Sequence, residues 1–302
     1  MSRLLWGIDL GGTKIEGVIL DADQPQSALH RLRRETGAAQ GYEHVLAQIV
    51  GVIRDLERVS GHSCPPVIGV GTPGALEPDT GALKNSNTTC LNGRPLLEDI
   101  QAALGSEVCT MNDANCFALA EALLGAGAGE EVVLGLILGT GVGGGIVVRG
   151  KIINGKHGIA GEWGHNPIAG ESRRCYCGRI GCVETVLAGP SLERDYREAG
   201  GDSVRLPEIA SRARDGEPLA AAVIRRLQEK FGEAIAAVIN IVDPDAIVIG
   251  GGVGNVDELY TGETRACIQR HVFTHEFQTR ILRPQLGDSA GVFGAALLGD
   301  CP

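Results

Sequence analysis

The sequence has no long apolar segment: none of its runs approaches the roughly 20 consecutive apolar residues that a membrane-spanning helix requires. Low-complexity tracts are also absent, and a composition of 43% hydrophobic and 21% charged residues is typical of a globular protein. The first residues, MSRLLWGIDLGG, indicate a short strand rather than a signal peptide. A chain of 302 residues is long enough for two domains, each with a hydrophobic core.

An excess of positive charge is missing as well, because the formal net charge is −10 and the sequence pI is about 5.2. An acidic chain without a basic stripe is a poor candidate for binding nucleic acid or an anionic membrane. Of the nine cysteines, three lie in residues 175–182. The other six are scattered, several of them in apolar segments: Cys64, Cys90, Cys109, Cys116, Cys267 and Cys301. Such unclustered cysteines indicate reduced thiols, and we therefore expect a cytoplasmic protein.

Strand and helix patterns alternate along the first part of the chain. Two apolar, β-type runs at residues 3–9 and 14–20 flank a short glycine-rich break, which predicts a β-hairpin. Residues 41–60 carry apolar side chains at helical spacing. Residues 67–76 read as a strand that runs into a Pro-Gly turn, and residues 107–127 as a strand, a turn and a helix that begins near Asp113.

The second part of the chain repeats this design. Residues 132–153 form another strand–glycine loop–strand unit, which we interpret as an internal duplication of residues 3–20. A mostly helical segment, 206–242, ends at Asp243-Pro244, and a strand with a glycine-rich turn follows at 245–255. Two related α/β halves predict a nucleotide site in the cleft between them. We expect domains at residues 1–112 and 113–288, with a small-residue helix at 289–302 able to pack back on the first domain.

Three glycine-rich loops follow apolar strands: IDLGGTK (8–14), LGTGVGGG (138–145) and IGGGVGN (249–255). Glycine allows close backbone approach and positive φ, so that successive N–H groups can point at phosphate oxygens. None of the loops is a Walker motif or a good dinucleotide fingerprint. One such loop alone would more simply be a hairpin turn. Three of them at strand ends favour a site for a nucleoside triphosphate.

Taken in order, DLGGTK, GTGVGGG, the histidine- and cysteine-containing segment 161–185 and IVIGGGV resemble the ROK family of bacterial sugar kinases and repressors. The resemblance covers essentially the whole chain. It implies an α/β fold with two ribonuclease-H-like domains, as in actin-like ATPases, around a cleft that binds the nucleotide and the sugar. It also implies that the nucleotide is ATP with Mg²⁺. The implied phosphate loops and adenosine contacts are Gly11, Gly12, Thr13 and Lys14, then Gly139, Thr140 and Gly141, and finally Gly250, Gly251 and Gly252.

Two aspartates are candidates for chemistry. Asp9 ends the first strand, and the resemblance implies that it contacts Mg²⁺ through water; the alternative is a carboxylate that caps the hairpin turn. Asn112 and Asp113 precede a helix, where an aspartate serves equally well as an N-cap or as a general base. The residues alone leave these two roles open. In the family that this chain resembles, the aspartate takes the proton of the attacking sugar hydroxyl and the asparagine contacts the sugar.

Residues 161–185 contain the side chains of a metal site. His165, Cys175, Cys177 and Cys182 supply one imidazole and three thiolates, the ligand set of a closed structural zinc site. A disulfide between Cys175 and Cys177 is the alternative, but pairing across one residue is strained and the expected compartment is reducing. A zinc ion with four protein ligands has no open position for water, so we expect it to be structural rather than catalytic.

Two glutamates flank these ligands, Glu162 before His165 and Glu184 after Cys182. By themselves they could be ordinary surface glutamates. The resemblance implies that both carboxylates and His165 contact a hexose, with one ring nitrogen of His165 on the metal. Gly74, in the Pro-Gly turn, and Asn87, in an asparagine-rich turn, lie where the sugar loops of the family lie, although such turns also form for purely structural reasons.

The resemblance leads us to expect an ATP-dependent hexose kinase that phosphorylates the 6-hydroxyl of fructose or mannose. N-acetylglucosamine and glucose are the alternative acceptors. ROK repressors carry a DNA-binding helix-turn-helix before the DLGGTK strand, which here begins at residue 3, and the net charge opposes DNA binding. We therefore expect a kinase rather than a repressor. The family resemblance also implies a homodimer.

Overall fold

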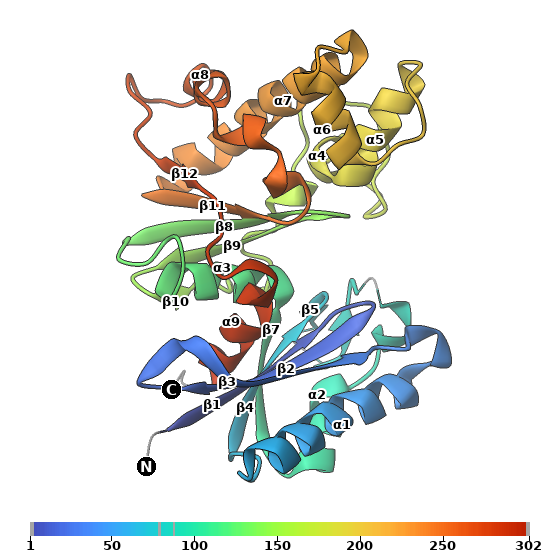
Figure 1. Ribbon diagram of the computed structural model, residues 1–302, viewed down its shortest axis with the longest axis vertical. Helices are drawn as coiled ribbons and strands as arrows, with labels where there is room; N and C mark the ends of the chain where they lie inside the picture. The colour runs from blue at the N-terminus through green and yellow to red at the C-terminus, as the bar shows by residue number, and fades with distance from the viewer. Residues whose placement is uncertain (1–2, 78–79, 87, 300–302) are drawn as a thin grey trace. The chain divides into compact units, whose positions relative to one another are not determined.

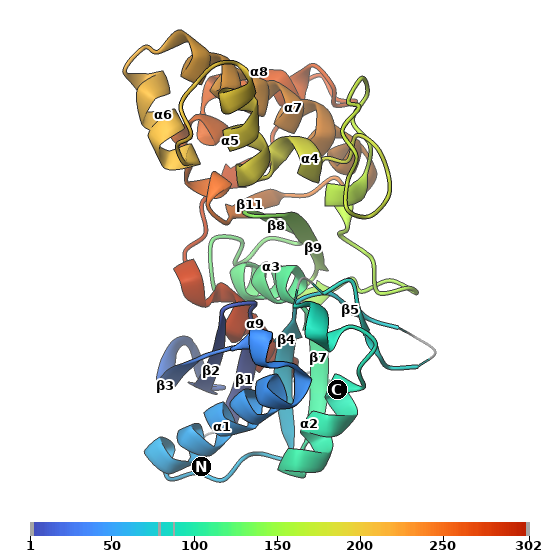
Figure 2. The same cartoon turned by 90° about the vertical axis from the view of Figure 1, so that its right-hand side faces the viewer.

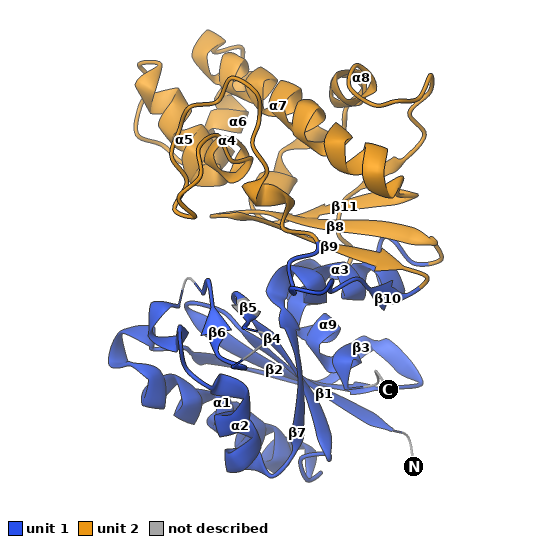
Figure 3. Cartoon of the chain, turned by 180° about the vertical axis from the view of Figure 1, so that it is seen from behind, with its two compact units in different colours: residues 1–128, 150–160, 286–302 blue, residues 129–149, 161–285 orange. Residues whose placement is uncertain are grey.

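The computed structural model describes residues 3–77, 80–86 and 88–299, which fold into two compact units (Figure 3). Unit 1 comprises residues 1–128, 150–160 and 286–302, and unit 2 comprises residues 129–149 and 161–285. The first unit thus continues through the helix that follows Asp113, and does not end at residue 112 as expected. None of the described helices is both long and apolar enough to cross a bilayer.

A five-stranded sheet in the order β3-β2-β1-β4-β7 forms the centre of unit 1. The hairpin of the first two strands is antiparallel and pairs Asp9 with Glu16, whereas β4 and β7 run parallel to β1. The strands are β1 (Leu4–Leu10), β2 (Lys14–Asp21), β3 (Gln24–Glu35), β4 (Val67–Thr72) and β7 (Glu107–Asn112).

Helices cover both faces of this sheet (Figure 1). The first two, α1 (Tyr42–Ser60) and α2 (Leu96–Leu104), pack on one face around a core that includes Ile15, Ile49 and Ile68. On the opposite face α9 (Ala290–Leu298) packs against β1 and β4 and also against α3 (Asp113–Leu123). The α3–α9 packing explains why α3 belongs to unit 1. Smaller elements of this unit are η1 (Ala38–Gln40), β5 (Ala75–Leu76), β6 (Leu83–Lys84), η2 (Thr89–Leu91), β10 (Lys151–Ile152) and η6 (Gly287–Ser289).

Helix α9 lies unusually close to the sheet because its neighbours have no side chains at the contact. A Cβ atom added to Gly69 would lie 1.7 Å from the carbonyl oxygen of Ala295, and one added to Gly7 would lie 2.4 Å from the nitrogen of Ala296. Only glycine fits at such distances. The close packing of α9 (AGVFGAALL) on the sheet therefore depends both on the small residues of the helix and on the glycines of the strands.

Unit 2 repeats the strand arrangement. An antiparallel hairpin of β8 (Val132–Leu138) and β9 (Val142–Val148) is followed in the sheet by β11 (Ala246–Gly250), parallel to β8, and then by β12 (Arg280–Leu282), parallel to β11. A helical layer covers this sheet (Figure 2) and includes buried Phe231 and Ile235 of the long helix α7 (Pro218–Val242). The other helices of this unit are η3 (Trp163–His165), α4 (Glu184–Leu187), α5 (Gly189–Glu198), α6 (Leu206–Arg214), η4 (Val253–Asn255), η5 (Asp257–Tyr260) and α8 (Gly262–Gln269).

The expected hairpins, at β1–β2 and β8–β9, are confirmed, as are the helices near residues 41–60 and 289–300. Strand β3 was not predicted. Its sequence, QPQSALHRLRRE, is polar because β3 lies at the edge of the sheet and alternates between exposed and half-buried positions.

Candidate active site

Asp9 and Asp113 lie at the same edge of the unit 1 sheet. Asp9 pairs with Gly71 of β4, which in turn pairs with Met111 of β7, so that the carboxyl ends of these parallel strands meet. Burial, the charge of Asp113 and the charge of Glu16 together raise the pKa of Asp9 to about 7, although Lys14 acts in the opposite direction. Two neighbouring carboxylates form a natural site for a divalent cation, because a cation relieves the repulsion between them.

Glycines leave room for the carboxylate of Asp9. A Cβ atom at Gly291, in the first turn of α9, would lie 2.9 Å from Asp9 Oδ2, and one at Gly71 would lie 3.4 Å from Oδ1. Glu16, opposite Asp9 on β2, is buried and pairs with Arg31 and Arg33 of β3. The two arginines pair with the carboxylate of Glu16, which would otherwise be a buried, unpaired charge.

The N-cap of α3 is Asn112, not Asp113. Asn112 has an extended backbone, and its Oδ1 accepts the N–H of Ala114 at 2.9 Å. Asp113 is the first residue of the helix, and its Oδ1 lies 2.8 Å from the same N–H. Capping therefore does not require an aspartate at position 113, because the preceding asparagine supplies the cap. That Asp113 acts as a general base stays a prediction, and its position at the start of the helix is compatible with that role.

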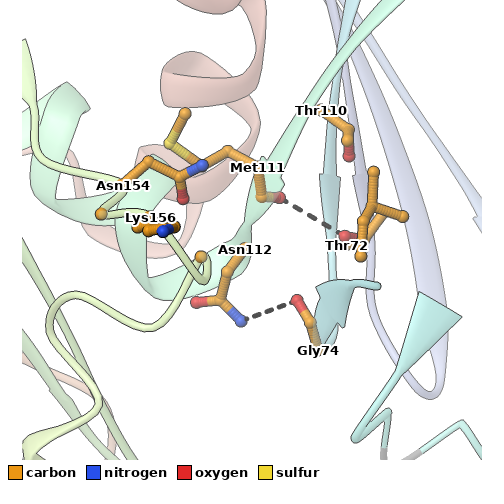
Figure 4. Close-up of a pocket in the computed structure, with 10 residues that line it drawn as sticks. Thr72, Gly74, Thr110, Met111, Asn112, Asn154 and Lys156 are labelled. Carbon is orange, nitrogen blue, oxygen red and sulfur yellow. Dashed lines mark hydrogen bonds between the residues drawn. The ribbon is translucent and has the colours of Figure 1, made fainter. Parts of the chain in front are cut away.

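A cavity of about 210 Å³ adjoins this helix start (Figure 4). Asn112 lies at its wall and donates an Nδ2 hydrogen bond to the carbonyl oxygen of Gly74 at 3.2 Å. Its wall carries several polar groups and few large apolar ones: Thr72, Gly74, Leu76, Thr110, Met111, Asn112, Asn154, Gly155, Lys156 and Gly158. Two of these residues, Gly74 and Asn112, were predicted from the sequence as sugar contacts. Lys156 and Asn154 were missed, because the loop after β10 carries no motif of its own.

Gly74 has a structural reason to be glycine. Its φ is +101°, and an added Cβ atom would lie 2.3 Å from the carbonyl oxygen of Lys84. Asn87, the other expected loop residue, lies outside the residues that the structure describes.

The first two glycine loops are hairpin turns whose backbones are fixed by hydrogen bonds. Gly11 N–H donates to the Lys14 carbonyl at 2.9 Å, and the Thr36 hydroxyl donates to the Gly11 carbonyl at 2.6 Å. In the second loop Gly139 N–H donates to the Gly141 carbonyl at 2.9 Å, and an added Cβ atom at Gly139 would meet nothing within 4 Å. Gly12 and Thr13 are exposed, so backbone groups at the tip of the first loop are available to a ligand.

In the third loop, Gly251 has φ of +82°, and an added Cβ atom would lie 2.4 Å from the carbonyl oxygen of Leu138. Glycine is therefore required at position 251, because the backbone there passes close to the end of β8. Gly252 faces open space, and the chain then enters η4. Gly250 is the last residue of β11.

His165, Cys175, Cys177 and Cys182 come together in unit 2, with one possible ligand atom from each within 4.8 Å of all the others. Cys175 Sγ lies 3.7 Å from His165 Nδ1, and Cys177 Sγ lies 3.6 Å from Cys182 Sγ. In a tetrahedral zinc site, neighbouring ligand atoms lie about 3.6–3.8 Å apart. The three cysteines are free thiols, so the alternative of a disulfide between Cys175 and Cys177 is wrong. The residues present thus fit a tetrahedral metal ion.

The two glutamates beside this cluster differ in how they are held. Glu184 begins α4, and its Oε2 accepts the N–H of Val142 at 3.0 Å, directly after the second glycine loop. Its other oxygen faces Cys175 Sγ at 3.9 Å. Glu162 is exposed; desolvation and the charge of Glu184 raise its pKa, whereas His165 lowers it. Both carboxylates therefore lie beside the cluster, Glu162 near His165 and Glu184 near Cys175, and their contact with a sugar stays a prediction.

Comparison with known proteins gives a consistent answer. The ROK family model matches residues 5–300. Over 98% of this chain, the sequence is 34% identical to N-acetylgalactosamine kinase AgaK of Shewanella sp. (strain ANA-3), covering 96% of that protein. It is likewise 34% identical to N-acetyl-D-glucosamine kinase of Escherichia coli O1:K1 / APEC, with 98% and 99% coverage. A ROK glucokinase from Streptomyces griseus, solved with glucose and AMPPNP, superposes with a TM-score of 0.80 at 29% identity, covering 98% and 99% of the two chains.

The duplicated α/β units, the paired carboxylates and the glycine loops define an enzyme of the actin-like ATPase fold that acts on sugars. The chain belongs to the ROK family. It is an ATP-dependent sugar kinase.

Proposed function

We propose that the chain transfers the γ-phosphoryl group of ATP to the 6-hydroxyl of an N-acetylhexosamine, either N-acetylglucosamine or N-acetylgalactosamine. Its similarity at 34% identity to kinases of these two sugars supports this choice. The same similarity favours N-acetylglucosamine, the alternative acceptor, over fructose or mannose, which become the second candidates. The observation that carries the proposal is the placement of Asp113 at the start of α3, beside Asp9 and next to the cavity residue Asn112.

Asp113 is the general base in this proposal. Phosphoryl transfer depends mainly on positioning and on neutralising charge, so one carboxylate near the acceptor hydroxyl is sufficient protein chemistry. The second carboxylate, Asp9, binds the Mg²⁺ of MgATP through water. Bound there, Mg²⁺ would supply positive charge against the repulsion between Asp9 and Asp113, and Asp113 accepts the proton of the attacking hydroxyl.

We assign the phosphate groups of ATP to two loops, Gly11–Lys14 and Gly139–Gly141, and the adenosine to Gly250–Gly252. Glu162, His165 and Glu184 bind hydroxyl groups of the sugar, together with Gly74 and Asn112. The Cys₃His cluster holds zinc, because three thiolates and one imidazole at tetrahedral spacing match the preference of that ion. With four protein ligands, the zinc is structural and holds the segment that carries both glutamates.

An ADP-coupled assay of the purified chain with five sugars tests this proposal. We expect the highest kcat/KM for N-acetylglucosamine or N-acetylgalactosamine, lower values for glucose, mannose and fructose, and a 6-phosphate product by ³¹P NMR. Because pocket contacts with an acetamido group can give large discrimination, the preference is expected to exceed about tenfold. Faster turnover of fructose or mannose would overturn the choice of acceptor and restore the first expectation.

A further inference from the structure

Arg283 lies at the edge of the unit 2 sheet where the second and third glycine loops begin. Strand β11 pairs in parallel with β8 on one side and with β12 on the other (Figure 1). The second loop follows β8, the third loop follows β11, and Arg283 follows β12 directly. In open α/β sheets ligands bind outside the carboxyl ends of the parallel strands, so Arg283 lies on the edge where a ligand is expected.

Three neighbouring groups hold the guanidinium of Arg283. Its Nη2 donates to Asp257 Oδ1 at 2.5 Å, its Nη1 lies 3.5 Å from the carbonyl oxygen of Gly254, and its Cζ lies 4.1 Å from the centre of the Tyr260 ring. A guanidinium packs on an aromatic face because the cation is attracted to the π electrons of the ring. Since the head group is fixed in advance, little conformational entropy is lost when a ligand binds to it.

Tyr260 connects this arginine with the third glycine loop. Its hydroxyl donates to the Gly254 carbonyl at 2.7 Å and lies 3.2 Å from the Ile249 carbonyl, and these two residues stand on either side of that loop. Burial raises the pKa of Tyr260 to about 12, with a smaller contribution from Asp257 and against the effect of Arg283, so the hydroxyl keeps the proton that it donates. The ring beneath Arg283 is therefore fixed to the loop that the proposed function assigns to adenosine.

The guanidinium of Arg283 keeps a surface for a ligand. Although it pairs with Asp257 and packs on Tyr260, 45% of the Arg283 side chain is exposed. Because Tyr260 covers one face of the planar group, the opposite face is the one that can stack on the flat ring of a nucleobase. A phosphate would instead need the N–H groups, and two of the guanidinium nitrogens already face Asp257 and Gly254.

The order of the strands also favours the base over the phosphates. The sheet runs β8-β11-β12, and neighbouring strands lie about 4.8 Å apart, so the end of β12 is about 10 Å from the end of β8. The proposed function places phosphate at the loop after β8 and adenosine at the loop after β11. A nucleotide that follows this edge from its phosphates onward brings its base to the end of β12, where Arg283 lies.

We propose that Arg283 is a specificity-determining residue for the nucleotide, and that its guanidinium stacks on the purine base of ATP. Tyr260 and Asp257 are positioning residues that hold the plane of the guanidinium. This inference rests on the proposed function, which assigns adenosine to Gly250–Gly252. It adds the group that distinguishes a purine base from a smaller pyrimidine base.

Calorimetric titration of the chain with MgADP and with magnesium tripolyphosphate tests this inference, because only MgADP carries a base. Arg283→Lys keeps a positive charge that can pair with Asp257 and loses the planar face. We expect the Kd for MgADP to rise about 3- to 10-fold, the range for one cation–π contact, and the Kd for tripolyphosphate to stay at its wild-type value. The KM for ATP should rise by the same factor, and the sugar KM should not change.

Arg205→Lys is the matched control. Arg205 is an exposed arginine of unit 2 that pairs with Glu193 at 2.9 Å. Its substitution makes the same chemical change away from the glycine loops, so both Kd values and both KM values should stay at their wild-type levels. A rise in the Kd for MgADP in Arg205→Lys equal to that in Arg283→Lys would overturn the inference, since the effect would not depend on position.

MgCDP gives a second comparison, because a pyrimidine offers a smaller ring for stacking. The wild type should bind MgADP more tightly than MgCDP, and Arg283→Ala should narrow the ratio of the two Kd values. An equal rise in the Kd for tripolyphosphate would overturn the inference, because the lost contact would then involve the phosphates or the loops as a whole. An unchanged Kd for MgADP in both Arg283 variants would overturn it as well.

The same titrations separate this inference from the proposed function. A wild type that binds MgADP but phosphorylates no sugar would overturn the proposed reaction and not the nucleotide site. A wild type that does not bind MgADP would overturn both.

Discussion

The carboxylate of Glu184 accepts the backbone N–H of Val142 at 3.0 Å, and this bond joins the end of the segment that carries the Cys₃His cluster to the second glycine loop. A second bond, from Gly189 N–H to the Gly139 carbonyl at 2.8 Å, lies alongside it. A residue predicted only to hold the sugar thus also positions a loop predicted to hold phosphate.

Glu184→Ala should therefore impair both substrates. We expect the sugar KM to rise about 10- to 100-fold, the range for a lost hydrogen bond to a charged group, and the KM for ATP to rise by a smaller factor. Glu184→Gln keeps an oxygen that can accept the Val142 N–H, and it should leave the KM for ATP near its wild-type value. Glu162→Ala is the comparison that should raise only the sugar KM. Steady-state kinetics in both substrates measure these effects, and an unchanged KM for ATP in Glu184→Ala would show that the bond does not position the loop.

Asp113→Asn should remove catalysis and leave the fold intact. The N-cap of α3 is Asn112, so the substitution does not uncap the helix. Loss of a general base is expected to lower kcat by about 10²- to 10⁴-fold, while calorimetry should show ATP binding unchanged. A variant that kept more than about a tenth of wild-type turnover would contradict the assignment of Asp113 as the base.

The raised pKa of Asp9 predicts a pH dependence of stability. Its carboxyl has a pKa of about 7 in the folded chain, against 3.8 for an unperturbed aspartate. Between these values the folded state binds the proton and the unfolded state does not, so the contribution of Asp9 to the free energy of unfolding falls as pH rises, by at most about 1.4 kcal/mol per pH unit. Asp9→Asn should remove this slope.

Urea unfolding in magnesium-free buffer tests this directly. Relative to wild type, Asp9→Asn should be more stable at about pH 8 and show little difference near pH 4, where both side chains are uncharged. Asp23→Asn, a change at an exposed position, is the control and should show no such pH dependence. An equal effect of Asp9→Asn at both pH values would contradict the raised pKa.

Removal of the metal should affect stability and sugar binding together. In the proposed zinc site, loss of the metal would free four ligands within residues 165–182, so chelation is expected to lower the melting temperature and raise the sugar KM, and added zinc should restore both. Elemental analysis should give one zinc per chain. A lower melting temperature with an unchanged sugar KM would show that the metal stabilises the chain without positioning the sugar site.

Substitution of Glu121 is expected to lower stability strongly. It is fully buried, and its two oxygens accept the N–H groups of Ala126 and Leu286, each at 2.9 Å. Glu121→Ala leaves both N–H groups without this acceptor and should lower the free energy of unfolding by about 2–5 kcal/mol. Glu276→Ala, at an exposed position, should change it by less than about 0.5 kcal/mol. A similar small change for Glu121→Ala, measured by urea unfolding, would contradict the structural role of Glu121.

The sequence by itself determined the repeated hairpins, the grouping of one histidine with three cysteines and the family, because these depend on local patterns. Apolar runs of β-type residues form strands wherever both faces are buried, and a histidine and three cysteines within one short segment need little further folding to meet. The polar edge strand β3 carries no such pattern, since its stability comes from pairing with β2.

Tertiary structure decided the rest. Helix α3 belongs to unit 1 because it packs against α9, which is far away in the chain. No local sequence pattern near residue 112 indicates this packing. The bond between Glu184 and Val142 and the raised pKa of Asp9 likewise arise from groups that only the fold brings together. The contact between the hydroxyl of Tyr176 and Nε2 of His165 also depends on the fold, because hydrogen bonds depend on direction as well as on distance.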